Sequence, residues 1–252
     1  MTRVTPTPRT LYVHDDLSDE LRSLGEDSAA GRLGRALLAL LDRNGVVVLT
    51  LGQQLDAVFA QGAHAPFAAA VGIGAAGARV AAALHARTGW FPAIHRVDAW
   101  REEDGRGGYV ISGPAPLTPQ LGALADVPSL AIVDDTVFSG LTMRTVLAAL
   151  PSGPRRRAHA FCLRAVSESL AEIARLVPVT AGLAAPGRIL EDVSFINASG
   201  LVRRTAIRRA GQPPLAFFER PEWMAAWFPG YHQEVIALCR ELNAHLEPAP
   251  AP

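Results

Sequence analysis

The fold of this chain is decided by the stretch at residues 130–150, whose sequence is LAIVDDTVFSGLTMRTVLAAL. It begins with four consecutive apolar residues, 130–133, a run too short for a helix and typical of a buried strand in a parallel sheet. Asp134 and Asp135 follow directly, at the end of the strand where open α/β sheets bind their ligands. This order predicts an α/β fold with polar chemistry at the carboxyl end of this strand.

The residues after the acidic pair form a small, hydroxyl-rich turn around Gly140 and then a helix. Apolar residues recur on one face of that helix, at Met143, Val146, Leu147 and Leu150. A helix N-terminus presents backbone N–H groups and the positive end of the helix dipole, and both favour a phosphate. The stretch therefore predicts a site for a sugar phosphate. The alternative is an ordinary buried strand that ends in a solvated Asp-Asp turn.

These residues resemble the phosphoribosyl-pyrophosphate (PRPP) motif of the type I phosphoribosyltransferases, in which four apolar residues and two acids precede a loop that closes on Gly and Thr. The resemblance covers residues 67–166. It implies that Asp134 and Asp135 act in catalysis by holding the ribose hydroxyls, directly or through water bound to Mg²⁺. We expect Asp135 to be an exposed carboxylate outside the core. The implied 5′-phosphate site consists of Thr136, Val137, Phe138, Ser139, Gly140, Leu141 and Thr142.

A glycine-rich turn follows another apolar run, at residues 67–73. Gly72, Gly74 and Gly77 match the G-x-G-x-x-G pattern of dinucleotide-binding loops, and Asp98 ends the next predicted strand, where such a site needs an acid. A tight turn for close packing of helix on sheet is a second possibility. The phosphoribosyltransferase resemblance implies a third, a pyrophosphate site, although an alanine stands where that family often has a basic residue. The implied pyrophosphate-binding residues are Gly74, Ala75, Ala76, Gly77 and Arg79.

A polar, glycine-rich segment at residues 98–108 separates this unit from the acidic strand. Long irregular loops inside compact domains are often lids over a site, and the family has a flexible catalytic loop at this position. The resemblance therefore implies that Arg101 acts in catalysis and that Arg106 binds pyrophosphate. A solvated hairpin accounts for the same composition equally well.

Strands and helices alternate along the rest of the chain, which predicts a central parallel sheet flanked by helices. The expected domains are an N-terminal extension (1–45), a phosphoribosyltransferase core (46–185) and a C-terminal hood or accessory segment (186–252). In that last segment Trp223, Trp227 and Tyr231 recur every four residues, which predicts a helix face docked on the core. Further expected strands lie at 11–14, 46–49, 92–97, 158–163 and 177–181, and helices at 33–41, 78–87, 167–176 and 232–246, with a strand or loop at 191–197.

Composition excludes several classes of function. The 24 basic and 24 acidic residues cancel, so no global field attracts nucleic acid or an anionic membrane. All the basic residues are arginines, which excludes Schiff-base chemistry on lysine and any phosphate loop that needs a lysine. No apolar run is long enough to span a membrane, and Cys162 and Cys239 have no metal-ligand or disulfide spacing. We therefore expect a cytoplasmic protein with reduced thiols.

The activity implied by the resemblance is Mg²⁺-dependent transfer of a phosphoribosyl group from PRPP to a nitrogenous base, with release of pyrophosphate, by a homodimer. Phe138 stands where the hypoxanthine-guanine enzymes carry an Asp that contacts the purine, so an orotate-type acceptor is favoured over those purines. The alternative is a PRPP-binding regulator that resembles the pyrimidine-operon attenuators, which have an aromatic residue at this position.

Overall fold

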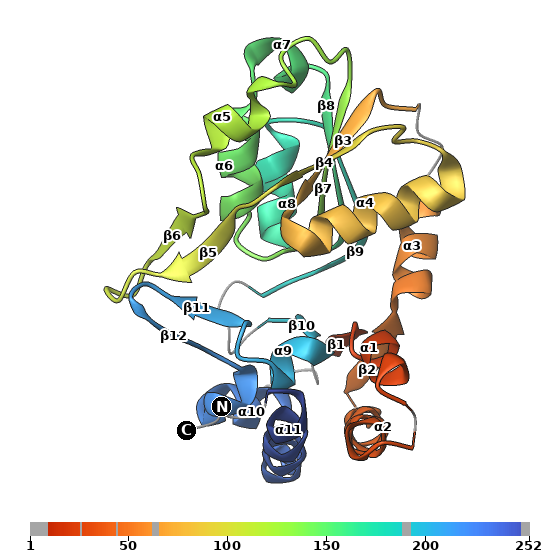
Figure 1. Ribbon diagram of the computed structural model, residues 1–252, viewed down its shortest axis with the longest axis vertical. Helices are drawn as coiled ribbons and strands as arrows, with labels where there is room; N and C mark the ends of the chain where they lie inside the picture. The colour runs from red at the N-terminus through yellow and green to blue at the C-terminus, as the bar shows by residue number, and fades with distance from the viewer. Residues whose placement is uncertain (1–9, 26, 44, 62–65, 188–192, 248–252) are drawn as a thin grey trace, which may run out of the picture. The chain divides into compact units, whose positions relative to one another are not determined.

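The computed structural model describes residues 10–25, 27–43, 45–61, 66–187 and 193–247. The chain forms two compact units, each described by itself (Figure 1). The first combines residues 1–51 with residues 189–252, and the second comprises residues 52–188. No helix in the described part of the chain is long and apolar enough to cross a membrane.

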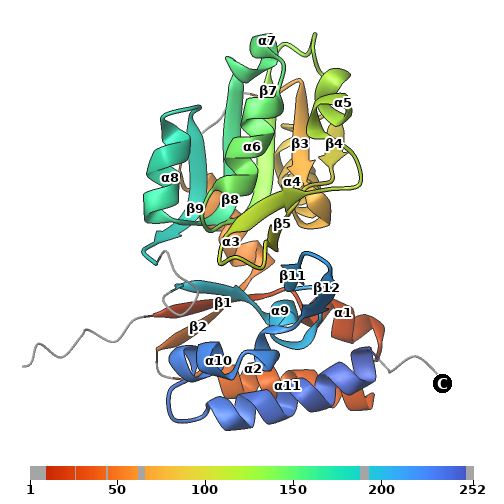
Figure 2. The same cartoon turned by 90° about the vertical axis from the view of Figure 1, so that its left-hand side faces the viewer.

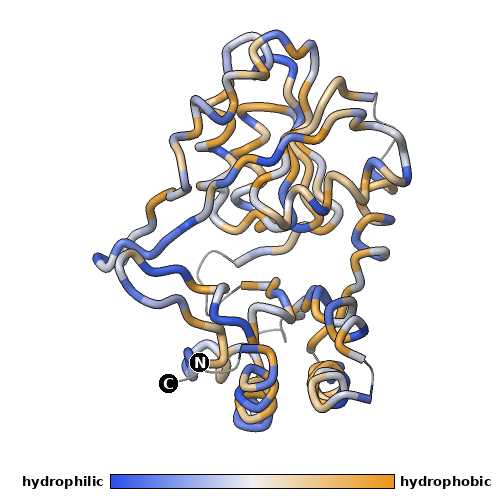
Figure 3. Tube along the Cα trace, viewed as in Figure 1, coloured by the Kyte–Doolittle hydropathy of each residue, from blue (hydrophilic) through white to orange (hydrophobic). Residues whose placement is uncertain are grey.

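The second unit is built on a five-stranded parallel sheet with the strand order β4-β3-β7-β8-β9. Hydrophobic residues concentrate along its central strands (Figure 3). The predicted fold class, a parallel α/β sheet flanked by helices, is therefore confirmed. The strands are β3 (Ala69–Ile73), β4 (Ile94–Val97), β7 (Leu130–Val137), β8 (Ala158–Val166) and β9 (Val179–Ala185).

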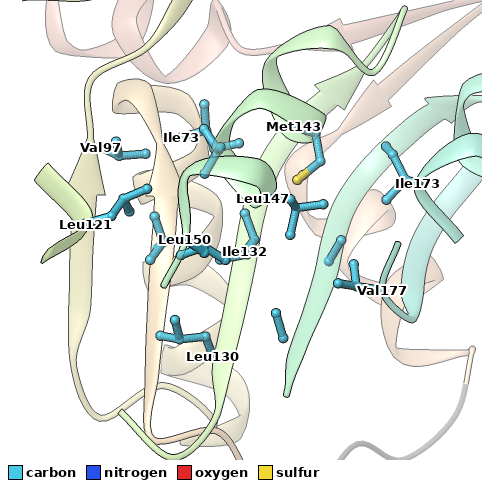
Figure 4. Packing of buried hydrophobic residues seen from close by; sticks show 14 of the residues in the cluster. Ile73, Val97, Leu121, Leu130, Ile132, Met143, Leu147, Leu150, Ile173 and Val177 are labelled. Carbon is cyan, nitrogen blue, oxygen red and sulfur yellow. The ribbon is translucent and has the colours of Figure 1, made fainter. Parts of the chain in front are cut away.

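Helices lie on both faces of this sheet (Figure 2). On one face, α5 (Leu117–Gly122), α6 (Leu141–Ala149) and α8 (Ser167–Ala174) share an apolar core with the strands, in which Ile132, Leu147 and Ile173 are buried (Figure 4). On the other face, α4 (Gly74–Thr88) packs against β3 and β7. The remaining helices of the unit are α3 (Leu51–Phe59), which begins at the last residue of the first unit, and α7 (Ser152–Arg155).

The strand order reverses between β3 and β7. The chain leaves β3 through α4 and adds β4 on one side, and it then returns to add β7 on the other side. The return passes through an antiparallel hairpin, β5 (Trp100–Glu103) with β6 (Tyr109–Ser112), and then through α5. Ligands of open α/β sheets bind at the carboxyl ends of the strands at such a reversal. The topology therefore predicts a ligand site at the carboxyl ends of β3 and β7.

Several element boundaries differ from the sequence-based expectation. The helix expected from residue 78 begins at Gly74, so the glycine turn is its first turn. Strand β7 continues through the acidic pair to Val137, because Thr136 and Val137 still pair with Arg164 and Ala165 of β8. The segment at 98–108 contains β5 and the turn of the β5–β6 hairpin. A hairpin was the alternative to a lid in the interpretation of this segment.

The first unit contains a separate parallel sheet with the order β10-β1-β2. Helix α11 packs on α2, so residues from both ends of the chain form one core. Trp223 and Trp227 are buried in α10 with ring centroids 5.9 Å apart, as predicted, but Tyr231 lies beyond the end of this helix and is only partly buried. Residues 191–192 of the expected strand or loop lie outside the described residues. The elements are β1 (Leu11–Asp15), α1 (Ser18–Ser23), α2 (Ala29–Leu41), β2 (Val46–Thr50), β10 (Phe195–Asn197), α9 (Ala198–Val202), β11 (Ile207–Arg209), β12 (Gln212–Leu215), the 3₁₀ turn η2 (Phe217–Glu219), α10 (Pro221–Trp227) and α11 (His232–Leu246).

Candidate active site

The glycine turn and the acidic pair meet where the strand order reverses. Helix α4 passes so close to β7 that a Cβ on Gly77 would lie 2.4 Å from the carbonyl oxygen of Val133 and 3.3 Å from the Cα of Asp134. A Cβ on Gly72 would lie 2.4 Å from the Cα of Ala78. Both positions therefore require glycine, which is the packing role expected of such a turn. The same close approach places the first turn of α4 beside Asp134.

Gly74 has a different role from the two packing glycines. Its φ of +61° suits glycine, and no atom lies within 4 Å of the position of a Cβ. The N–H groups of residues 74–76, at the start of α4, have no partner within the helix, and in the described part of the chain the N-cap residue Ile73 makes no side-chain capping hydrogen bond. Ala75 and Arg79 are exposed on this helix. This turn of backbone can donate hydrogen bonds to an anion, while Arg79 is the nearest cation along the helix.

The surroundings of Asp98 disfavour a dinucleotide site. Asp98 follows β4 as expected, and its Oδ1 lies 2.6 Å from Nη2 of Arg96. The segment after β4 is an antiparallel hairpin and not the helix and parallel strand that would continue a dinucleotide-binding sheet.

Asp134 is a carboxyl group with a strongly perturbed proton affinity. Its Oδ1 accepts a hydrogen bond from the backbone N–H of Asp135 at 2.9 Å. Burial raises the pKa of Asp134 well above its ordinary value, the neighbouring Asp135 carboxylate raises it further, and Arg164 offsets only a smaller part. Two adjacent carboxylates thus differ in their tendency to hold a proton.

Asp135 is not the exposed carboxylate that we expected from the sequence. Its side chain is only 18% exposed, and its Oδ2 lies 3.2 Å from Nη2 of Arg164, whose side chain is 1% exposed in β8. Nη1 of Arg164 donates to Oε1 of Gln54 in α3 at 2.5 Å. A buried guanidinium is costly without a counter-charge, so Arg164 favours the ionised form of Asp135 and fixes its orientation.

Sequence reasoning missed Arg164 and Gln54. A signal for Arg164 was present, because it is the one charged residue in the otherwise apolar run at 160–166. Buried charges in such runs are normally paired. Gln54 had no signal, since 110 residues separate it from Arg164 in the chain.

The turn before α6 is shorter than the predicted phosphate loop. Thr136 and Val137 belong to β7, so the turn itself comprises residues 138–140. Gly140 caps α6 with a φ of +68°, and Oγ of Ser139 accepts a hydrogen bond from the N–H of Leu141 at 3.3 Å. The N-terminus of α6, including Thr142, lies at the same edge of the sheet as the first turn of α4. Two helix N-termini and two carboxylates therefore surround the reversal point.

The two candidate arginines of the lid lie on the β5–β6 hairpin. The guanidinium of Arg101 stacks on the ring of Tyr109, with its carbon 4.2 Å from the ring centroid, and burial lowers the pKa of Arg101. Arg106 is exposed in the turn, where its backbone N–H donates to Oδ1 of Asp104. Within the described residues, neither arginine has a hydrogen bond or ion pair to the acidic pair. The structure thus does not join the hairpin arginines to Asp134 and Asp135.

The acidic pair fits a magnesium ion only in part. Across the described ranges, no group of three His, Cys, Asp or Glu side chains could hold a metal ion. Magnesium is often bound through one or two carboxylates while water and substrate phosphates complete its octahedral shell. Asp134 and Asp135 meet that lesser requirement, so the donor set suits an ion that arrives with a diphosphate.

Cys162 lies opposite Asp134 in the register of β7 with β8, whereas Cys239 belongs to α11 of the first unit. Cys162 and Cys239 are free thiols, and burial raises the pKa of each, so both stay protonated at neutral pH.

Comparisons with known proteins found similarity only among solved structures. No protein-family model matches the chain, and no curated protein sequence matches it. A hypothetical protein from Neisseria gonorrhoeae, solved with bound ppGpp, has 18% identity and a TM-score of 0.42 over 66% of this chain and 82% of its own.

Two of the other similar structures are phosphoribosyltransferases. The purine phosphoribosyltransferase of Pyrococcus horikoshii has 17% identity and a TM-score of 0.39, over 74% of this chain and 92% of its own. The orotate phosphoribosyltransferase of Aeropyrum pernix has 22% identity and a TM-score of 0.36, over 53% and 70%. Because every one of these TM-scores is below 0.5, the residues of the site must support any function by themselves. The similar structures also include other phosphoribosyltransferases.

Proposed function

We propose that this protein transfers the phosphoribosyl group of PRPP to a nitrogenous base and releases pyrophosphate. The observation that carries the proposal is the meeting of three parts at one reversal of strand order: the first turn of α4, the pair Asp134-Asp135, and the turn before α6. PRPP carries phosphate groups at both ends and a sugar diol between them. Each of the three parts would therefore contact one group of this ligand.

The roles follow from the chemistry of each part. The N–H groups at 138–142 would bind the 5′-phosphate, and those at 74–76 the pyrophosphate, with Arg79 and Arg106 as the available cations. Asp135, held ionised by Arg164, would accept hydrogen bonds from the ribose hydroxyls and stabilise positive charge on the ribose as pyrophosphate leaves. Magnesium, held by Asp134 and Asp135, would supply charge neutralisation to the diphosphate. Arg101 would act from the hairpin once it has closed.

The first test is a screen of nucleobases and analogues with PRPP and Mg²⁺, read by release of pyrophosphate. We expect turnover with at least one base and loss of about 100-fold or more in Asp135→Asn, the scale of losing an electrostatic stabiliser. Asp126→Asn is the matched control, because Asp126 is an exposed carboxylate of the same unit. Since Asp135 is paired with buried Arg164, thermal unfolding of Asp135→Asn must show that the variant is folded. Wild-type turnover in a folded Asp135→Asn protein would refute the assignment.

A PRPP-binding regulator is the second candidate, favoured by Ala75, which leaves the first turn of α4 without the basic side chain that pyrophosphate release would use. The two candidates differ in their response to Arg101→Ala. A transferase should lose about 10- to 1000-fold in turnover on losing this charged donor, with less effect on PRPP binding. A regulator should bind PRPP with the same affinity in Arg101→Ala as in the wild type. Neither protein should then release pyrophosphate with any base. Tyr109→Leu is the control, because it removes the stacking partner of Arg101 and keeps the charge.

A further inference from the structure

A second concave site lies in the same unit, at the other end of α6. A pocket of about 370 Å³ opens there among the end of α6, the short helix α7 and the end of α8. We call it the arginine pocket, because Arg144, Arg155, Arg156 and Arg175 all line it. Its volume falls in the range that small-molecule sites occupy. None of these arginines belongs to the site at the ends of β3 and β7.

Charge in the arginine pocket is far from balanced. Arg144 is ion-paired with Glu172, and Arg155 donates to the carbonyl oxygen of Ala148 at 3.5 Å, which is a common helix-capping role. In the part of the chain that the structure describes, the guanidinium groups of Arg156 and Arg175 have neither an ion pair nor a hydrogen bond. The carboxyl ends of α6 and α8 contribute about half a negative charge each. Four arginines against one glutamate and two helix ends leave a net charge of about +2.

The pocket also has an apolar wall. Leu147 and Val177 line it from the core, and Leu176, whose side chain is more than half exposed, lines it near the surface. Guanidinium groups bind phosphates through two parallel hydrogen bonds and also stack on flat aromatic rings. A ligand that matches this pocket therefore has two or more negative charges next to a flat or apolar body.

We propose that the arginine pocket binds a phosphorylated small molecule of the nucleotide type, with its phosphates on Arg156 and Arg175 and its base against Leu176. The concave shape favours a compact ligand over a nucleic-acid strand, and the zero net charge of the chain means that no global field attracts a polyanion. The proposal is independent of phosphoribosyl transfer, since it uses none of the residues assigned to that reaction.

The test is binding of ATP to the whole chain, measured by calorimetry at physiological ionic strength. We expect Arg156→Gln and Arg175→Gln each to weaken ATP binding about tenfold, the effect of losing one charge-assisted hydrogen bond. Arg240→Gln is the matched control, because Arg240 is an exposed arginine of the first unit and should bind ATP as the wild type does. Asp135→Asn should also leave ATP binding unchanged, which separates this pocket from the proposed transferase site.

Three results would overturn the proposal. The first is that wild-type protein binds no ATP, and the second is that both pocket variants bind it with wild-type affinity. The third is that a single-stranded RNA binds and loses affinity in the pocket variants while ATP does not, which would assign the arginines to nucleic acid. Because all the substituted arginines are at the surface, circular dichroism should show folded variants throughout. Failure of the nucleobase screen would leave this test unaffected.

Discussion

At the scale of single residues, the two carboxyl groups of the candidate site, Asp134 and Asp135, have different surroundings. Asp134 and Asp135 are adjacent in the chain, yet the pKa of Asp134 is raised and Asp135 is held in an ion pair. Burial and the neighbouring charge act on Asp134, whereas Asp135 faces the buried guanidinium of Arg164. Because Arg164 also bonds Gln54, the position of Asp135 depends on three elements of the fold. In the proposed function this carboxylate would bind the sugar diol.

The raised pKa of Asp134 predicts how stability depends on pH. A carboxyl group whose pKa is raised on folding binds more protons in the folded state than in the unfolded state between the two pKa values, so the free energy of unfolding falls as pH rises through that interval. Asp134→Asn removes the ionisable group, and with it this loss in the free energy of unfolding. We expect the variant to be more stable than wild type at neutral pH and the difference to vanish below the ordinary carboxyl pKa.

Urea unfolding at a series of pH values measures this difference. Asp126→Asn is the control, an exposed change in the same unit that should stay within about 0.5 kcal/mol of wild type. If Asp134→Asn proves less stable than wild type at neutral pH, burial of the charge is not what governs Asp134.

At the scale of secondary structure, α6 is the element on which most of the inferences depend. Its N-terminus follows the turn at 138–140, its apolar face packs on β7 through Val146 and Leu147, and its carboxyl end borders the arginine pocket. Gly140 decides how the helix begins, because its φ of +68° turns the chain sharply from strand into helix. A Cβ at this position would make ordinary contacts of 3.6 Å with Ile173 and Ser169. The requirement for glycine is therefore one of backbone conformation.

Gly140→Val tests the turn before α6 as a phosphate site. A β-branched residue at positive φ costs on the order of 1–3 kcal/mol, and the turn should relax in a way that withdraws its N–H groups from the phosphate. We expect the PRPP dissociation constant to rise by about tenfold or more, measured by calorimetry. Gly122→Val is the control, since nothing lies within 4 Å of the position of its Cβ and its φ is not positive. If the two variants bind PRPP with equal affinity, the turn before α6 is not the phosphate site.

At the scale of the whole molecule, each unit has its own core. The first unit is assembled from both ends of the chain: β10 pairs with β1, and α11 packs on α2. The second unit contains every residue assigned to PRPP and every residue of the arginine pocket. Mutations that loosen the first unit should therefore spare the candidate site.

Leu242→Ala tests this independence, because Leu242 is fully buried in α11. Losing its side chain should cost the first unit about 2–5 kcal/mol. We expect hydrogen exchange to quicken in β1 and α2, at the opposite end of the sequence, and to remain slow in β3, β7 and β8. Arg240→Ala, an exposed change in the same helix, is the control. Equal loss of protection in both units would mean that they unfold as one.

Local patterns in the sequence predicted the parallel α/β architecture of the second unit and the place of the acidic pair at the end of its strand. Four apolar residues before two acids are typical of a strand in a sheet with both faces covered, and the helical spacing after Gly140 predicted a helix that covers one face. The positions of the acidic pair and of the glycines were therefore predictable, as was the aromatic helix at Trp223 and Trp227. These are local patterns, in which the period of apolar residues reveals the element.

The neighbours of the acidic pair and the segments that share a core depend on contacts between distant parts of the chain. Arg164 reaches Asp135 because β8 is the next strand in space, and Gln54 reaches Arg164 across 110 residues of chain. The two ends of the chain form one unit for the same reason, since pairing of β1 with β10 is a contact between residues more than 180 positions apart. No local pattern encodes such contacts, because they depend on strand order, and strand order is settled by the packing of whole elements.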